Sequence, residues 1–153
     1  MAAVKFEWSS SVPEWLANVP DDPRNWHGGE QIGKGYFRTV RVAKWDTRLV
    51  VKHAQPSGGI GHNYREFHTW SEVGFTQWSK WFAPVVAISE DGRKLLQVRA
   101  INSGKPVGKV PEFFSDLKED NWGWLNGHAV CLDYGYTKLA TMGLKKVRMK
   151  RWD

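Results

Sequence analysis

Apolar and polar residues alternate along much of this chain with the two-residue period that is typical of β-strands. The runs Gln31–Ala43 and Arg48–Ala54 are rich in β-branched and aromatic residues, and the KWDT sequence between them predicts a hairpin turn. Residues 83–89 and 93–100 form a second pair of runs around EDG, a sequence that favours a tight turn. The pattern therefore predicts two antiparallel strand pairs.

The period changes at Asn63, where apolar residues begin to recur at the spacing of an α-helix. These residues are Tyr64, Phe67, Trp70 and Val73. They predict one main helix over Asn63–Val73, after a glycine-rich loop at 55–63. A shorter helix is predicted after Ser11, a suitable N-cap, and Pro20 ends it. Strands, one helix and strands again indicate an α+β domain with a mainly antiparallel sheet.

Length and composition restrict the class of protein. A chain of 153 residues is one domain by the usual length prior, and 10 tryptophans argue against a disordered chain. No basic start followed by an apolar run, and no run long enough to span a bilayer, appears in the sequence. Cys131 is the only cysteine, so no internal disulfide can form. We predict a soluble protein of the cytoplasm with no membrane partner.

The net charge of +6 is concentrated at the C-terminal end. Residues 138–153 carry six basic residues and one acidic residue, whereas the rest of the chain is nearly neutral. This distribution favours contact with an anion, such as a nucleic acid through Lys138–Arg151 or an acidic protein face. A solvated tail that aids solubility explains the same charges equally well.

Three features in the first half of the chain suggest an anion site. Gly33 and Gly35 lie in a turn between two strand-like runs, where the missing Cβ lets backbone N–H groups approach a phosphate. Lys52 lies within an apolar strand, so its ammonium needs an anion if that face of the sheet is covered. Glu66, on the predicted helix, is a suitable partner for it.

Further along, the sequences DLKEDN and DYG place Asp116, Asn121 and Asp133 at the two ends of an apolar run. With the glycine turn, the strand lysine and the helix glutamate, these motifs resemble those of the protein kinase family in order and spacing. The resemblance covers about residues 31–135. It implies a kinase-like N-lobe, with an antiparallel sheet and one main helix, plus a minimal remnant of the C-lobe made of the catalytic loop and a metal-binding hairpin.

The resemblance implies a role for each matching residue. Those that it assigns to ATP are Gly33, Gly35, Val40, Lys52, Glu66, Val98 and Ala100. Asp116 would accept the proton of the attacking hydroxyl, with Lys52 and Lys118 assisting the transfer of the phosphoryl group. Asn121 and Asp133 offer the hard oxygen donors that Mg²⁺ prefers. ATP and Mg²⁺ are thus the expected cofactors.

The chain also departs from the kinase pattern. Arg38 replaces the third glycine of the loop, where it would either crowd the phosphates or contact them. Phe114 and Ser115 stand where the family has His-Arg. Only 18 residues follow Gly135 in this sequence, so we expect no activation segment and no helical platform of the kind that binds an acceptor in the family.

We therefore predict a single miniature kinase-like domain over 1–153. It comprises an N-terminal extension at 1–30, an N-lobe-like part at 31–100, the catalytic-loop and DYG remnant at 101–137, and the basic tail at 138–153.

The five histidines do not form a convincing zinc pattern, because His62 and His68 fall on different faces of the helix.

Three functions stay open. The first is an enzyme that binds Mg-ATP and transfers the γ-phosphate to a Ser or Thr hydroxyl of a protein acceptor or of itself. The second is a catalytically weak or inactive pseudokinase-type module that binds and modulates a host or partner protein. The third is a nucleic-acid-binding protein that uses the basic tail.

So compact a form of a large fold suggests a small genome, such as that of a bacteriophage acting in the host cytoplasm. The sequence indicates no oligomeric state.

Overall fold

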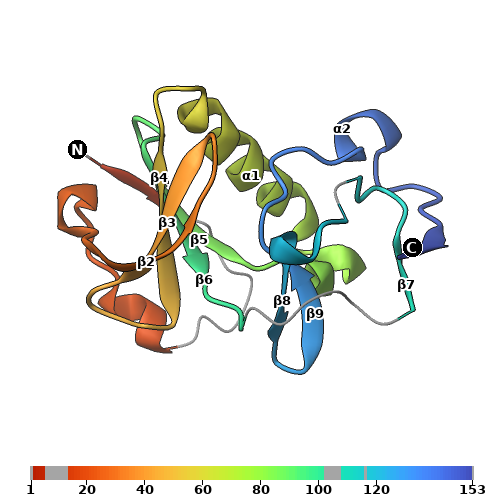
Figure 1. The fold of residues 1–153 in the computed structure, drawn as a ribbon, viewed down its shortest axis with the longest axis horizontal. Helices are drawn as coiled ribbons and strands as arrows, with labels where there is room; N and C mark the ends of the chain where they lie inside the picture. The colour runs from red at the N-terminus through yellow and green to blue at the C-terminus, as the bar shows by residue number, and fades with distance from the viewer. Residues whose placement is uncertain (1, 6–13, 102–107, 116, 153) are drawn as a thin grey trace.

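A computed structural model describes residues 2–5, 14–101, 108–115 and 117–152 of the chain (Figure 1). These residues form an α+β fold with one main helix and a six-stranded antiparallel sheet. Asp116 lies outside the described residues. None of the helices in the described part has both the length and the apolar content needed to cross a bilayer.

The sheet has the strand order β1-β5-β6-β4-β3-β2, and every neighbouring pair is antiparallel. Its strands are β1 (Ala3–Lys5), β2 (Gly28–Lys34), β3 (Arg38–Ala43), β4 (Leu49–Ala54), β5 (Val85–Ser89) and β6 (Lys94–Val98). The two predicted hairpins are confirmed, as β3–β4 and β5–β6. The sequence pattern did not predict β1, which pairs with β5 at one edge of the sheet.

The main helix α1 (Gly59–Val73) begins four residues before the predicted start at Asn63. The segment predicted as a loop therefore contributes the first turn of the helix, so this boundary was wrong. The backbone at Gly59 packs so closely against Phe37 and Ala54 that a side chain would not fit there. This tertiary contact explains why the helix begins at a glycine, despite the low helix propensity of that residue.

Both faces of the sheet are covered, which produces a three-layer core. On one face, α1 packs against β4, β5 and β6, and this cluster continues into the C-terminal segments around Phe82, Phe113 and Trp122, all of which are fully buried. On the other face, Leu16 and Trp26 belong to a second cluster with Leu96. The N-terminal extension therefore forms part of the core. It carries two short 3₁₀ helices, η1 (Glu14–Asn18) and η2 (Pro23–Asn25).

The remaining elements form a second region beside the sheet (Figure 1). They are η3 (Gln77–Trp81), β7 (Lys109–Pro111), η4 (Glu119–Asn121), β8 (Trp122–Leu125), β9 (His128–Cys131), α2 (Leu139–Met142) and β10 (Met149–Arg151). The predicted hairpin between Asn121 and Asp133 is confirmed as β8–β9, and its turn contains Asn126 and Gly127 at positive φ.

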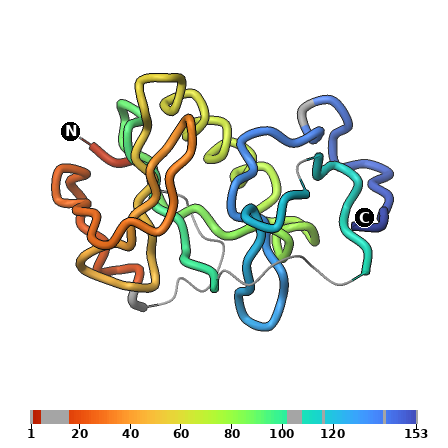
Figure 2. The backbone as a smooth tube through the Cα atoms, in the orientation of Figure 1, coloured from red at the N-terminus to blue at the C-terminus, as the bar shows by residue number. Residues whose placement is uncertain are grey.

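The C-terminal segment folds back onto the chain. In Figure 2 its end runs beside β7, and β10 pairs with β7 in an antiparallel two-stranded sheet. Trp152 packs edge-on against the buried Trp122, with ring centroids 5.3 Å apart. Much of the basic tail is therefore anchored to the protein by long-range strand pairing and by this tryptophan contact, while basic residues such as Lys145, Lys146 and Arg148 stay exposed.

Candidate functional site

A cleft of about 1200 Å³ lies between the β2–β3 hairpin and the segments that flank the β8–β9 hairpin. Most of the predicted site residues line it. These are Gly33, Gly35, Val40, Lys52, Val98, Ala100, Asn121 and Asp133. The fold thus brings together residues that are up to a hundred positions apart in the sequence.

Lys52 and Glu66 form a buried ion pair at the base of the cleft. Lys52 lies in the central strand β4, where it pairs with Val40 of β3 and Leu95 of β6. Its Nζ atom is 2.5 Å from Oε1 of Glu66 and also donates to the carbonyl oxygen of Leu132. Glu66 is fully buried on α1, behind the residues that line the cleft. The predicted partnership of these two residues is present in the structure.

Arg38 is the strongest additional partner of Glu66. Its Nη1 and Nη2 atoms donate to the two carboxylate oxygens of Glu66, each at 3.0 Å. Nη1 also donates to Oδ1 of Asn63 at 3.1 Å, and Nη2 donates to Oδ1 of Asp133 at 3.0 Å. Only 5% of Arg38 is exposed. The Arg38 side chain therefore joins α1 to the segment that contains Asp133.

The charges of this network act on one another. Burial opposes ionisation of Glu66, but the positive charges of Arg38 and Lys52 lower the pKa of its carboxyl group below the ordinary value. Burial and the neighbouring Arg38 lower the pKa of Lys52, against the opposite effect of Glu66 and Asp133. The arrangement is two cations, Arg38 and Lys52, facing the two carboxylates Glu66 and Asp133.

Asp133 lies at the boundary between this network and the open cleft, with 45% of its side chain exposed. The Nε2 atom of His62 is 2.8 Å from Oδ1, the same oxygen that accepts from Arg38. Burial opposes ionisation, but His62, Arg38 and Lys52 lower the pKa of this carboxyl group well below its ordinary value. Asp133 is therefore an anion at neutral pH.

Asn121 is held close to Asp133 by the hairpin between them. The carbonyl oxygen of Asn121 accepts a hydrogen bond from the backbone N–H of Leu132 at 2.6 Å, and the next residue, Trp122, pairs with Cys131. The apolar run between the two polar residues is thus a hairpin that fixes their separation. This geometry explains why polar residues bracket an apolar segment in the sequence.

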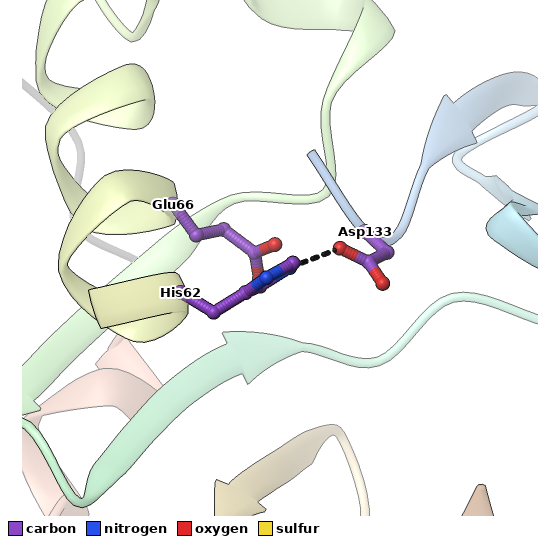
Figure 3. A group of neighbouring side chains, drawn as sticks. All are labelled: His62, Glu66 and Asp133. Carbon is purple, nitrogen blue, oxygen red and sulfur yellow. Dashed lines mark hydrogen bonds and ion pairs between the residues drawn. The ribbon is translucent and has the colours of Figure 1, made fainter. Parts of the chain in front are cut away.

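His62, Glu66 and Asp133 offer ligand atoms within 4.8 Å of one another (Figure 3). Both oxygens of Glu66 are already bonded, because Oε1 accepts from Lys52 and Arg38 while Oε2 accepts from Arg38 and the backbone N–H of Tyr134. A metal ion at this cluster would have to displace the Arg38 guanidinium. The three residues are better described as part of a charge network than as a metal centre.

Asn121 and Asp133, the ligands predicted for Mg²⁺, fit that ion only in part. Both residues line the cleft and both carry the hard oxygen donors that it prefers. However, Oδ1 of Asp133 already accepts from Arg38 and His62. A cation bound to this carboxylate would lie beside a fixed guanidinium.

Two predicted residues are not placed at the cleft. Lys118 is exposed and is not among the described residues that line it. Asp116 falls outside the described part of the chain. Sequence reasoning missed His62 and left the direction of Arg38 open. A signal existed for both. His62 precedes Glu66 by one helical turn, and Arg38 lies on the same face of β3 as Val40, two residues on.

Comparison of the chain with protein-family models, with curated proteins and with solved structures finds no match. Functional inference therefore depends on the motifs and on the geometry of the cleft.

Proposed function

We propose that this protein binds a nucleoside triphosphate in the cleft, through a kinase-like arrangement of residues. One observation carries the proposal. The buried Lys52–Glu66 pair, the glycine hairpin and the Asn121–Asp133 hairpin meet around one cleft of about 1200 Å³. Their order along the chain is the order that the resemblance to protein kinases implies. Mg²⁺ at Asn121 and Asp133 stays a prediction, and the proposal does not depend on it.

The two glycines of the hairpin support the proposal from a separate direction. Neither Gly33 nor Gly35 has a positive φ. A Cβ atom at Gly33 would make only ordinary contact with Val40, and one at Gly35 would meet open space. The fold therefore does not require glycine at either position. Glycine at both positions leaves the backbone open to close approach by a ligand.

We expect Gly33→Ala and Gly35→Ala to weaken ATP binding by roughly tenfold, because each adds a methyl group to the lining of the cleft where we propose that the phosphates bind. The melting temperature without nucleotide should be unchanged. Isothermal titration calorimetry measures the affinity. Gly61→Ala, on α1 and outside the cleft, is the matched control and should bind ATP normally. Equal affinity in all variants, or no ATP binding by the natural protein, would contradict the proposal.

We further propose that the bound nucleotide is the donor in phosphoryl transfer to a hydroxyl of a protein acceptor or of the chain itself. The bond between the terminal phosphorus and the bridging oxygen breaks, and ADP leaves with the electron pair. The acceptor oxygen bonds to phosphorus, and its proton passes to Asp116, as the resemblance implies. With γ-labelled ATP, label transfer that Asp116→Asn abolishes supports an enzyme. Binding without transfer supports the pseudokinase-type module.

A second candidate function is nucleic-acid binding. The β7–β10 pairing places Arg151 opposite Lys109, so the basic C-terminal segment and β7 contribute to one surface. Other exposed basic residues of this segment are Lys138, Lys145, Lys146 and Arg148. Fixed positive charges on a folded surface suit a phosphate backbone. Both candidate functions agree with the expectation of a cytoplasmic protein that binds a protein or a nucleic acid.

If this surface binds DNA or RNA, the double substitution Lys145→Glu and Lys146→Glu should weaken binding at least about tenfold, because it replaces two cations with two anions. The affinity of the natural protein should fall steeply with rising salt. A mobility-shift titration at several salt concentrations measures both effects. Lys44→Glu changes an exposed lysine beside the β3–β4 turn, outside the basic segment, and should bind normally. Salt-independent binding would argue against the surface.

A further inference from the structure

The charge of Asp133 is already matched inside the protein. Its Oδ1 atom accepts from Nη2 of Arg38 at 3.0 Å and lies 2.8 Å from Nε2 of His62. Lys52 binds the carbonyl oxygen of Leu132, the residue immediately before it. A carboxylate that faces a phosphate site normally repels the phosphates unless a cation offsets its charge. Here the buried guanidinium of Arg38 contacts that carboxylate from the protein side.

Arg38 is fixed in this place by its other bonds. It forms a two-point contact with Glu66 and a third bond with Asn63, and it is buried. Such planar, bidentate contacts are the strong form of an arginine–carboxylate pair. Arg38 and Lys52 balance Glu66 and Asp133, so the group is neutral without any metal. A divalent cation at Asp133 would add two positive charges beside the guanidinium.

We propose that Arg38 takes the place of a divalent cation at Asp133, so that the cleft binds a metal-free nucleoside triphosphate. This inference rests on the proposed function. It changes the expected ligand from the magnesium complex to the free polyanion. It also gives a role to the residue that departs from the glycine pattern. Arg38 acts here as a positioning residue and counter-charge that works through Asp133.

Other charges of the cleft favour the same ligand. Besides Arg38 and Lys52, three basic residues line it, against the two carboxylates of Asp120 and Asp133. These three are Lys34, Arg48 and Arg99. Arg48 is paired with Asp46, whose carboxylate is 2.7 Å away. The lining therefore provides cations of its own for a polyphosphate.

The test is the affinity for a non-hydrolysable ATP analogue, measured by calorimetry with excess Mg²⁺ and again with EDTA. The two dissociation constants of the natural protein should agree within about threefold, because metal and nucleotide are then nearly uncoupled. In Arg38→Met, Asp133 loses its counter-charge, so Mg²⁺ should tighten binding by at least about tenfold. Arg41→Met removes an arginine of the same strand that does not line the cleft, and should leave the ratio unchanged.

A second variant keeps the test decisive if Arg38→Met does not fold. Asp133→Asn retains an oxygen that accepts from Arg38 and His62, so the fold should persist. We expect this variant to bind the analogue in EDTA at least as tightly as the natural protein. Metal-dependent binding by the natural protein, above about threefold and abolished by Asp133→Asn, would overturn the inference alone. No binding in either condition would overturn the proposed function as well.

Discussion

Arg38→Met should lower the free energy of unfolding by about 3–5 kcal/mol, the typical cost of removing one partner from a buried ion pair. Glu66 is fully buried and receives two of its hydrogen bonds from Arg38. Without the guanidinium, the partners of that carboxylate within the described part of the chain are Lys52, a weak contact from Gln97 and the backbone N–H of Tyr134. Thermal unfolding followed by circular dichroism should show a melting temperature lower by roughly 10 °C.

Lys52→Met is the matched control, because it deletes the other cation of the same network. Arg38 still holds both oxygens of Glu66, and burial already makes the ammonium of Lys52 costly. We expect a loss of only about 1 kcal/mol, the scale of a single hydrogen bond. If Lys52→Met were as destabilising as Arg38→Met, Arg38 would not be the main counter-charge of Glu66. Replacement by methionine rather than alanine avoids a large cavity in both variants.

The protein should lose stability steeply as the pH falls below about 4, through Glu66 and Asp133. Burial opposes ionisation of both groups, but the adjacent cations, with His62 at Asp133, lower both pKa values in the folded state. The unfolded chain then binds more protons in acid, so this contribution to stability is complete above about pH 5, beyond the ordinary carboxyl pKa values. It is lost as the pH falls toward the lowered values of the folded state.

Urea unfolding at a series of pH values measures this dependence. In Asp133→Asn, the free energy of unfolding should fall less steeply with decreasing pH, because one of the two carboxyl groups no longer titrates. Asp120→Asn is the matched control, since Asp120 is an exposed carboxylate that lines the same cleft. Asp120→Asn should leave the pH dependence of the unfolding free energy in acid unchanged. An equal effect of both substitutions would show that net charge, rather than the buried network, controls acid stability.

Much of the secondary structure follows from local patterns. The strands β3 to β6 and most of α1 were predictable because apolar residues recur every second position in strands and every three to four positions in a helix. Turn sequences also separate these elements from one another. The β8–β9 hairpin was predictable for the same reason, with Asn126 and Gly127 at its turn. By contrast, β1 and β10 are three residues long, and each depends on a partner far away in the sequence. Short edge strands carry too little pattern of their own.

The candidate site also contains residues that the sequence indicated and contacts that it did not. The motifs identified Lys52, Glu66, Asn121 and Asp133, because their order and spacing are properties of the sequence. They did not identify His62 as a partner of Asp133, since 71 positions separate the two residues. The direction of Arg38 was equally hidden, because a strand residue can point to solvent, to a ligand or to a buried carboxylate with the same local pattern.

The sequence by itself determined the α+β class, most of the main helix and several of the residues that line the cleft, such as Lys52, Asn121 and Asp133, because periodicity and motif order are encoded locally. Only the tertiary structure decided how the charges pair. The contacts of Arg38 with Glu66 and Asp133 span 28 and 95 positions, and they form because buried charges must find partners wherever the fold brings them together. That pairing decides whether Asp133 faces the cleft as a bare anion or as a neutralised one.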